Sequence, residues 1–158
     1  MTIDRLLLDT NLLLLWIVGN VARDYIPQHK RLKAFTGPDF DYLKTILAGS
    51  NSVTTTVNAW TEVTNIIPFG VRPPLSRHLL DFVRFAVQQW PELYHPSRNI
   101  VEDGAFMELG LADGALLSSL DNKTTLLTTD APLYWHALAR GHRAFNFHHL
   151  REERGLTS

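Results

Sequence analysis

The chain contains no cysteine, which excludes disulfide bonds and thiolate metal sites. It also lacks a surplus of positive charge: its formal net charge is −1, so no overall field attracts a polyanion such as nucleic acid. The longest apolar run, Leu12–Val18, is much shorter than the ~20 residues that a membrane-spanning helix requires. Binding of nucleic acid would therefore depend on a local basic patch or on a bound cation.

The N-terminal residues lack the basic lead and the small-residue cleavage site of a signal peptide. A length of 158 residues, with 45% hydrophobic and 20% charged residues, suits one domain with a substantial core. We therefore expect a cytoplasmic protein without a membrane segment. Residues 1–150 are expected to form the domain, and residues 151–158 a polar C-terminal tail.

The order of the apolar segments predicts a three-layer α/β/α domain with a mostly parallel central sheet. Residues 5–8 are almost wholly apolar, as in a strand covered on both faces, and residues 53–57 are β-branched. Residues 20–40 are polar and are expected to be irregular. Two further strands are expected at 125–128 and 143–147, and helices at 12–18, 40–47, 57–67, 76–90, 98–109, 113–120 and 131–139.

Four acidic residues, Asp9, Glu62, Asp113 and Asp130, each lie in a different hydrophobic segment. Asp9 and Asp130 directly follow predicted strands, at the edge where parallel sheets place their ligand sites. Carboxylates beside apolar segments are costly to bury unless a hard divalent cation or another group compensates them. The pattern therefore predicts a Mg²⁺ or Mn²⁺ site that is assembled by folding.

Each of these acids alone also has a local explanation. Asp113 could complement the dipole of the helix that it begins, and Asp130 could cap a helix that starts at Ala131. Glu62 could lie on a solvated helix face. Asp9 has the weakest local explanation, because it directly follows an apolar central strand.

The segments that carry the acids resemble the four acidic motifs of the PIN-domain family, and especially the VapC-type ribonuclease toxins of toxin–antitoxin pairs. The resemblance covers about residues 5–147 and implies a PIN-like nuclease domain. The matching stretches, in the family's order, are Leu7-Leu8-Asp9-Thr10-Asn11, Thr61-Glu62-Val63, Leu111-Ala112-Asp113-Gly114-Ala115-Leu116-Leu117 and Leu127-Thr128-Thr129-Asp130.

The resemblance implies an endoribonuclease that uses Mg²⁺ or Mn²⁺ to hydrolyse RNA. By resemblance, Asn11 becomes a polar helper near the first acid, and Thr128 or Thr129 supplies a hydroxyl beside the site. An RNA substrate, an inhibitory antitoxin protein and a homodimer are implied as partners. The residues that by resemblance become metal ligands, directly or through water, are Asp9, Glu62, Asp113 and Asp130.

Two features depart from the family pattern. Gly114 stands where alanine is common, which would weaken that helix start by up to ~1 kcal/mol. Residues 20–49 look longer than the family average, which leaves the choice of substrate open.

Two other functions remain as alternatives. A non-catalytic PIN-like module would bind RNA or protein through its surface, although degenerate copies usually lack one or more of the acids. A phosphotransferase of the haloacid dehalogenase type would require a second aspartate two residues after Asp9, where this chain has Asn11.

Other polar and aromatic residues give weaker indications of function. The histidines lack the spacing of a zinc motif. The four tryptophans, Trp16, Trp60, Trp90 and Trp135, are expected in the core or at an interface rather than in base stacking. The densest basic cluster forms either a solvated loop or a phosphate-binding patch; it comprises Arg23, His29, Lys30, Arg31 and Lys33.

Overall fold

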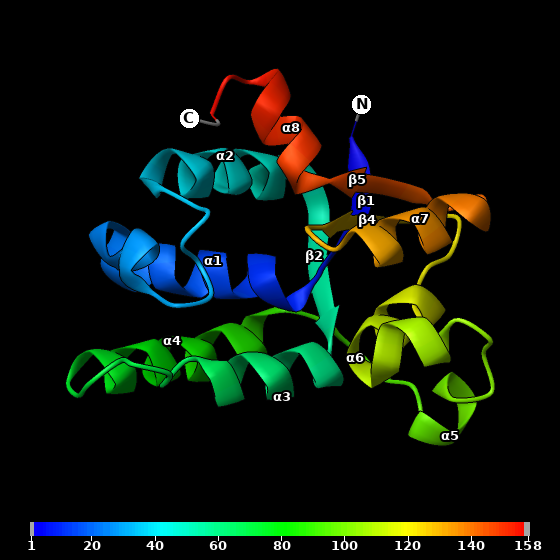
Figure 1. Ribbon diagram of the computed structural model, residues 1–158, viewed down its shortest axis with the longest axis horizontal. Helices are drawn as coiled ribbons and strands as arrows, with labels where there is room; N and C mark the ends of the chain where they lie inside the picture. The colour runs from blue at the N-terminus through cyan, green and yellow to red at the C-terminus, as the bar shows by residue number, and fades with distance from the viewer. Residues whose placement is uncertain (1, 157–158) are drawn as a thin grey trace.

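The computed structural model describes residues 2–156, which form an α/β domain with a five-stranded, all-parallel sheet (Figure 1). The strand order across the sheet is β3-β2-β1-β4-β5. The strands are β1 (Ile3–Leu8), β2 (Ser50–Thr56), β3 (Glu92–Leu93), β4 (Thr124–Thr128) and β5 (Arg143–Asn146). The helices are α1 (Thr10–Ala22), α2 (Gly37–Ala48), α3 (Val57–Ile66), α4 (Leu75–Gln89), α5 (Ser97–Ile100), α6 (Phe106–Ser118), α7 (Ala131–Ala139) and α8 (Phe147–Glu153), with a 3₁₀ helix at Arg23–Gln28.

Helices cover both faces of the sheet, which confirms the predicted three layers. Leu6 and Leu8 of β1 pack into the core formed with α1 to α4, whereas Leu7 packs into a second core with α6 and α7. Figure 1 shows α1 and α2 on one side of the sheet and α6 and α7 on the other. Because both faces of β1 are buried from Leu6 to Leu8, consecutive residues there are all apolar.

Trp60 lies inside the first core, and the partly buried Trp16 and Trp90 pack against that core, as expected. The ring centroids of Trp16 and Trp90 are 4.4 Å apart, and those of Trp60 and Trp90 are 5.7 Å apart. These side chains therefore pack against one another instead of forming an external apolar face. Trp135 differs, because 61% of its surface is exposed.

The strands that follow β1 are added first on one side of it, as β2 and β3, and then on the other side, as β4 and β5. Strand β1 pairs with β2 on one side and with β4 on the other, and Leu8 is in register with Leu127. The register places Asp9 beside Thr128, at the carboxyl ends of adjacent strands. Such a topological switch point is where open parallel sheets hold their ligands.

Residues 20–40 are more ordered than the sequence suggested. Helix α1 continues to Ala22, a 3₁₀ helix follows, and a capping box of Thr36 and Asp39 begins α2. The apolar contacts of Ile26, Leu32 and Phe35, all buried in the first core, offset the weak local propensity of this polar segment.

Two glycines shape the region around the third acid. Gly110 has φ 77°, which breaks the helical geometry between the predicted helices 98–109 and 113–120. A Cβ on Gly114 would lie 2.7 Å from Cγ2 of Ile100, so α5 approaches α6 too closely for alanine. The glycine at position 114 thus permits packing that the usual alanine would disturb.

The C-terminal segment belongs to the folded domain beyond the predicted boundary at residue 150. Helix α8 crosses that boundary, and Arg151 is only 6% exposed. Its Nε donates to Oδ1 of buried Asp39 at 2.6 Å, and its Nη2 donates to the carbonyl of Ala34. None of the helices within residues 2–156 has the length and apolar character needed to cross a membrane.

Candidate active site

Asp9 stands at the end of the central strand and caps helix α1. Its Oδ1 accepts a hydrogen bond from the Leu12 N–H at 2.9 Å. Its Oδ2 accepts from the Thr128 hydroxyl and the Thr129 N–H at 2.7 Å each, and from the Thr129 hydroxyl at 3.2 Å. Burial raises the pKa of Asp9, and these hydrogen bonds offset only part of the rise. The carboxylate is therefore held in one orientation.

Asp130 caps helix α7, so its predicted local role as a helix cap is confirmed. Its Oδ1 accepts from the Leu133 N–H at 2.8 Å, and its own N–H donates to Oγ1 of Thr128 at 2.9 Å. The Thr128 hydroxyl thus links the backbone of Asp130 to the carboxylate of Asp9. Because capping occupies only one carboxylate oxygen, Asp130 can cap the helix and face a ligand at the same time.

Folding brings all four acids to one pocket of 180 Å³ at the carboxyl edge of the sheet. Glu62 enters it from α3 and Asp113 from α6, two helices that contact each other. Asn11 also lines the pocket, and its Nδ2 donates to Oγ1 of Thr129 at 3.3 Å. The complete lining is Asp9, Thr10, Asn11, Arg31, Glu62, Asp113 and Asp130.

The acids repel one another in this pocket. The pKa of Asp113 rises from 3.8 to about 7, first because of burial and then because of the negative charges of Asp130, Asp9 and Glu62. A metal-free site therefore holds a proton on Asp113 near neutral pH. A bound cation would replace that proton and relieve the repulsion.

The chemistry of the donors fits a hard divalent cation. No three acidic or histidine side chains within residues 2–156 are arranged as a ready-made metal-binding group. Mg²⁺ usually binds through one or two carboxylates and keeps several waters, so it does not need such a group. The second oxygen of Asp130 and both oxygens of Glu62 form no hydrogen bond with residues 2–156, which leaves them available as ligands.

Two lining residues were not among the predicted residues of the acidic site. Thr10 lies in the first acidic motif, and its buried Oγ1 has no hydrogen-bond partner within residues 2–156. Arg31 belongs to the basic cluster, but Lys30 and Lys33 of that cluster do not line the pocket. Spacing along the chain could not show which of Lys30, Arg31 and Lys33 lines the pocket, because the local turn decides which side chain faces the acids.

A buried histidine positions the turn that carries Arg31. The Arg31 N–H donates to Nδ1 of His29 at 3.1 Å, and Nε2 of His29 lies 3.4 Å from the carbonyl oxygen of Ile67. Burial lowers the pKa of His29, so the ring is neutral and its Nε2–H faces the carbonyl. This histidine has a structural role, and it attaches the turn to the end of α3.

A scan of the chain against protein-family models finds no match, and a search of curated proteins finds none.

Proposed function

We propose that this protein is an endoribonuclease that uses Mg²⁺ or Mn²⁺ to hydrolyse RNA phosphodiesters. The observation that carries the proposal is the meeting of Asp9, Glu62, Asp113 and Asp130 in one pocket at the switch point of the sheet. These residues come from four separate segments, so chance proximity along the chain does not explain their convergence. The raised pKa of Asp113 supports a site that requires a compensating cation.

The side chains of the pocket would have different roles in hydrolysis. A bound Mg²⁺ would supply Lewis-acid chemistry, in which a phosphoryl oxygen is polarised and water becomes more acidic. Asp9 and Asp130 have fixed orientations, which suits them to hold the ion. Glu62 and Asp113 are suited to orient water and to accept its proton. Water adds to phosphorus, the bond to the departing ribose oxygen breaks, and that oxygen takes up a proton.

Arg31 would provide the positive contact that the net charge of the protein does not. It is the cationic side chain among the residues that line the acidic pocket. A guanidinium can donate two hydrogen bonds to a phosphate, which suits it to hold the RNA backbone beside the cation. The basic cluster would therefore act mainly through this one residue.

The resemblance extends the proposal to partners and location. As a VapC-type toxin, the protein would act in the cytoplasm, form a homodimer and be inhibited by an antitoxin protein. These points follow from the motifs alone. A gene for a small DNA-binding protein with an apolar tail, beside the gene for this chain, would support the antitoxin.

Glu62→Gln provides the cleanest test of catalysis. Asp9→Asn would place an amide NH₂ against the N–H of either Leu12 or Thr129 and weaken the fold. The Glu62 side chain, in contrast, forms no hydrogen bond with residues 2–156. We expect Glu62→Gln to cleave a mixed-sequence pool of single-stranded RNA at least about 100-fold more slowly, in Mg²⁺, than the unmodified protein. EDTA should stop the unmodified protein, and added Mg²⁺ should restore it.

Glu102→Gln is the matched control, because it removes the same charge from an exposed residue outside the pocket. Cleavage by this control should equal that of the unmodified protein. Undiminished cleavage by Glu62→Gln, or in EDTA, would refute the proposal. Tight RNA binding without cleavage under any of these conditions would favour the non-catalytic PIN-like module.

A further inference from the structure

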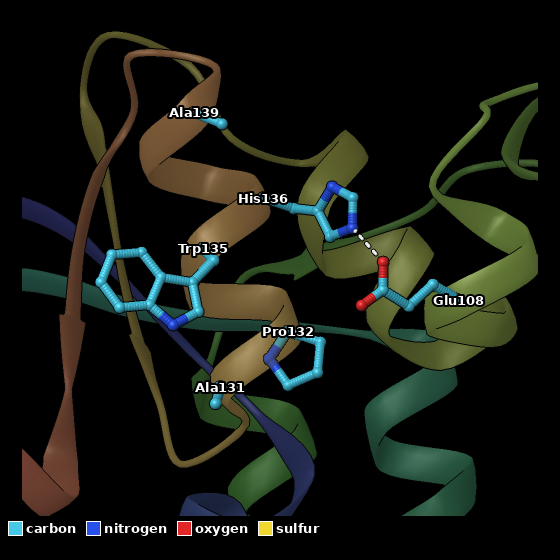
Figure 2. Close-up of a pocket in the computed structure, with 6 residues that line it drawn as sticks. All are labelled: Glu108, Ala131, Pro132, Trp135, His136 and Ala139. Atoms are coloured by element: carbon cyan, nitrogen blue, oxygen red, sulfur yellow. Dashed lines mark hydrogen bonds and ion pairs between the residues drawn. The ribbon is translucent and has the colours of Figure 1, made fainter.

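A second pocket lies on the outer face of helix α7 (Figure 2). It has a volume of 420 Å³ and is lined by Glu108, Ala131, Pro132, Trp135, His136 and Ala139. Ala131 directly follows Asp130 in the chain, so the start of α7 contributes one lining residue to each pocket. We call the second pocket the α7 groove.

The α7 groove combines an aromatic wall with a polar wall. Figure 2 shows Trp135 on one side, the His136–Glu108 pair on the other, and the Pro132 ring between them. Nε2 of His136 lies 2.8 Å from Oε2 of Glu108. The other carboxylate oxygen of Glu108 is turned toward Pro132 and the groove in Figure 2.

The walls of the groove are fixed relative to each other. Arg140, at the end of α7, donates two hydrogen bonds to Asp103 at 2.6 and 2.7 Å. This bidentate pair holds the pKa of Asp103 below its ordinary value and ties α7 to the segment that leads into α6. The His136–Glu108 contact joins α7 to α6 itself. A site preorganised in this way loses little entropy when a ligand binds.

We propose that the α7 groove binds one nucleobase of the RNA strand whose phosphate lies in the acidic pocket. This inference rests on the proposed ribonuclease function and names a specificity site for it. Trp135 is five positions beyond Asp130, which is about 7.5 Å along a helix and roughly the length of one nucleotide. Its exposed indole provides the stacking surface that proteins use for unpaired bases.

The polar wall selects among the bases. A carboxylate oxygen only accepts hydrogen bonds, so Glu108 favours a base that presents an exocyclic amino group. Adenine, cytosine and guanine carry such a group, whereas uracil presents carbonyl oxygens on both sides of its single N–H. A protein helix in the same groove would leave the Glu108 carboxylate beside apolar side chains, at an energetic cost.

The test measures binding of oligoribonucleotides to the Glu62→Gln protein in Mg²⁺, so that they stay intact. Dye-labelled pentamers of adenylate, cytidylate and uridylate are titrated by fluorescence anisotropy. We expect the adenylate and cytidylate pentamers to bind more tightly than the uridylate pentamer. Trp135→Ala should weaken binding of the first two by at least about five-fold, whereas Trp135→Phe should retain most of it.

Two further variants separate the roles of the groove. Glu108→Gln should reduce the preference over uridylate, because an amide offers both a donor and an acceptor. Phe85→Ala is the matched control: Phe85 is 59% exposed, nearly as much as Trp135, but lies on α4 outside the groove. Its affinities and base preference should equal those of the Glu62→Gln parent.

The possible failures are distinguishable. Unchanged affinities in Trp135→Ala, together with metal-dependent cleavage by the otherwise unmodified protein, would overturn the groove and leave the ribonuclease intact. If that variant instead bound RNA normally but lost self-association in light scattering, the groove would be a protein interface and the base site would be overturned. Absence of cleavage by the unmodified protein would refute the proposed function and the base site together.

Discussion

The charge balance of the acidic pocket is best tested by replacing Asp113 with asparagine in the absence of metal. In the unfolded chain Asp113 ionises near its ordinary pKa of 3.8, whereas in the folded protein its pKa is about 7. Between these values the folded protein binds more protons than the unfolded chain. The free energy of unfolding therefore falls as the pH rises through this window and levels off above pH 7. Asparagine carries no proton to lose, so the variant should lack this fall.

The magnitude follows from the displacement of the pKa. Each tenfold change in proton affinity is equivalent to about 1.4 kcal/mol, so a pKa of about 7 in place of 3.8 corresponds to at most about 4 kcal/mol. Solvent reaches the half-buried side chain and screens its neighbours, which leaves ~2 kcal/mol. Asp113→Asn should then raise the melting temperature at pH 8 by roughly 4–8 °C for a domain of this size.

The assay is thermal unfolding followed by circular dichroism in EDTA, from pH 5 to pH 8. The stability advantage of Asp113→Asn over the unmodified protein should grow across this range. Glu102→Gln, which removes an exposed carboxylate, should show no such growth. Addition of Mg²⁺ at pH 8 should stabilise the unmodified protein more than the variant. An advantage that does not change with pH would refute the assigned pKa and the repulsion that explains it.

Two further predictions concern the arginines. In a variant that binds RNA without cutting it, Arg31→Ala should lower the salt slope of binding by about 1. Lys30→Ala removes the same charge outside the pocket and should change the slope less. Equal effects of the two variants in salt titrations would contradict a specific phosphate contact. Arg151→Ala should lower the free energy of unfolding in urea by about 3–5 kcal/mol, because it strands the buried carboxylate of Asp39. Arg84→Ala, which breaks an exposed pair, should cost below about 1 kcal/mol, and a similar cost for both would contradict the buried pair.

Local patterns in the sequence were sufficient for four of the five strands and for the four acids. The apolar run before Asp9 predicts a strand because burial on both faces demands apolar residues. The run at 53–57 predicts a strand because its residues are β-branched, although the strand itself spans Ser50–Thr56. Parallel strands end at a common edge, so Asp9 and Asp130 were expected at the same edge of the sheet. The pairing of β1 with β4 is what brings them close together. The two-residue strand β3 left no such pattern, because it is too short to show one.

Tertiary packing decided which way individual side chains point and which of them are buried. Helical periodicity places Trp135 on an apolar stripe, but the face of α7 that carries it has no covering element within residues 2–156. Arg31 faces the acids because buried His29 orients its turn, a contact that no spacing encodes. The polar sequence of residues 151–153 predicts a tail, yet Arg151 is buried. Its guanidinium pairs with the buried carboxylate of Asp39, which lies 112 positions earlier in the chain. The sequence by itself determined which acids follow the ends of the strands, since strand boundaries and polarity are local properties. Only the tertiary structure decided which neighbours surround them, because contacts between distant segments depend on how the helices pack.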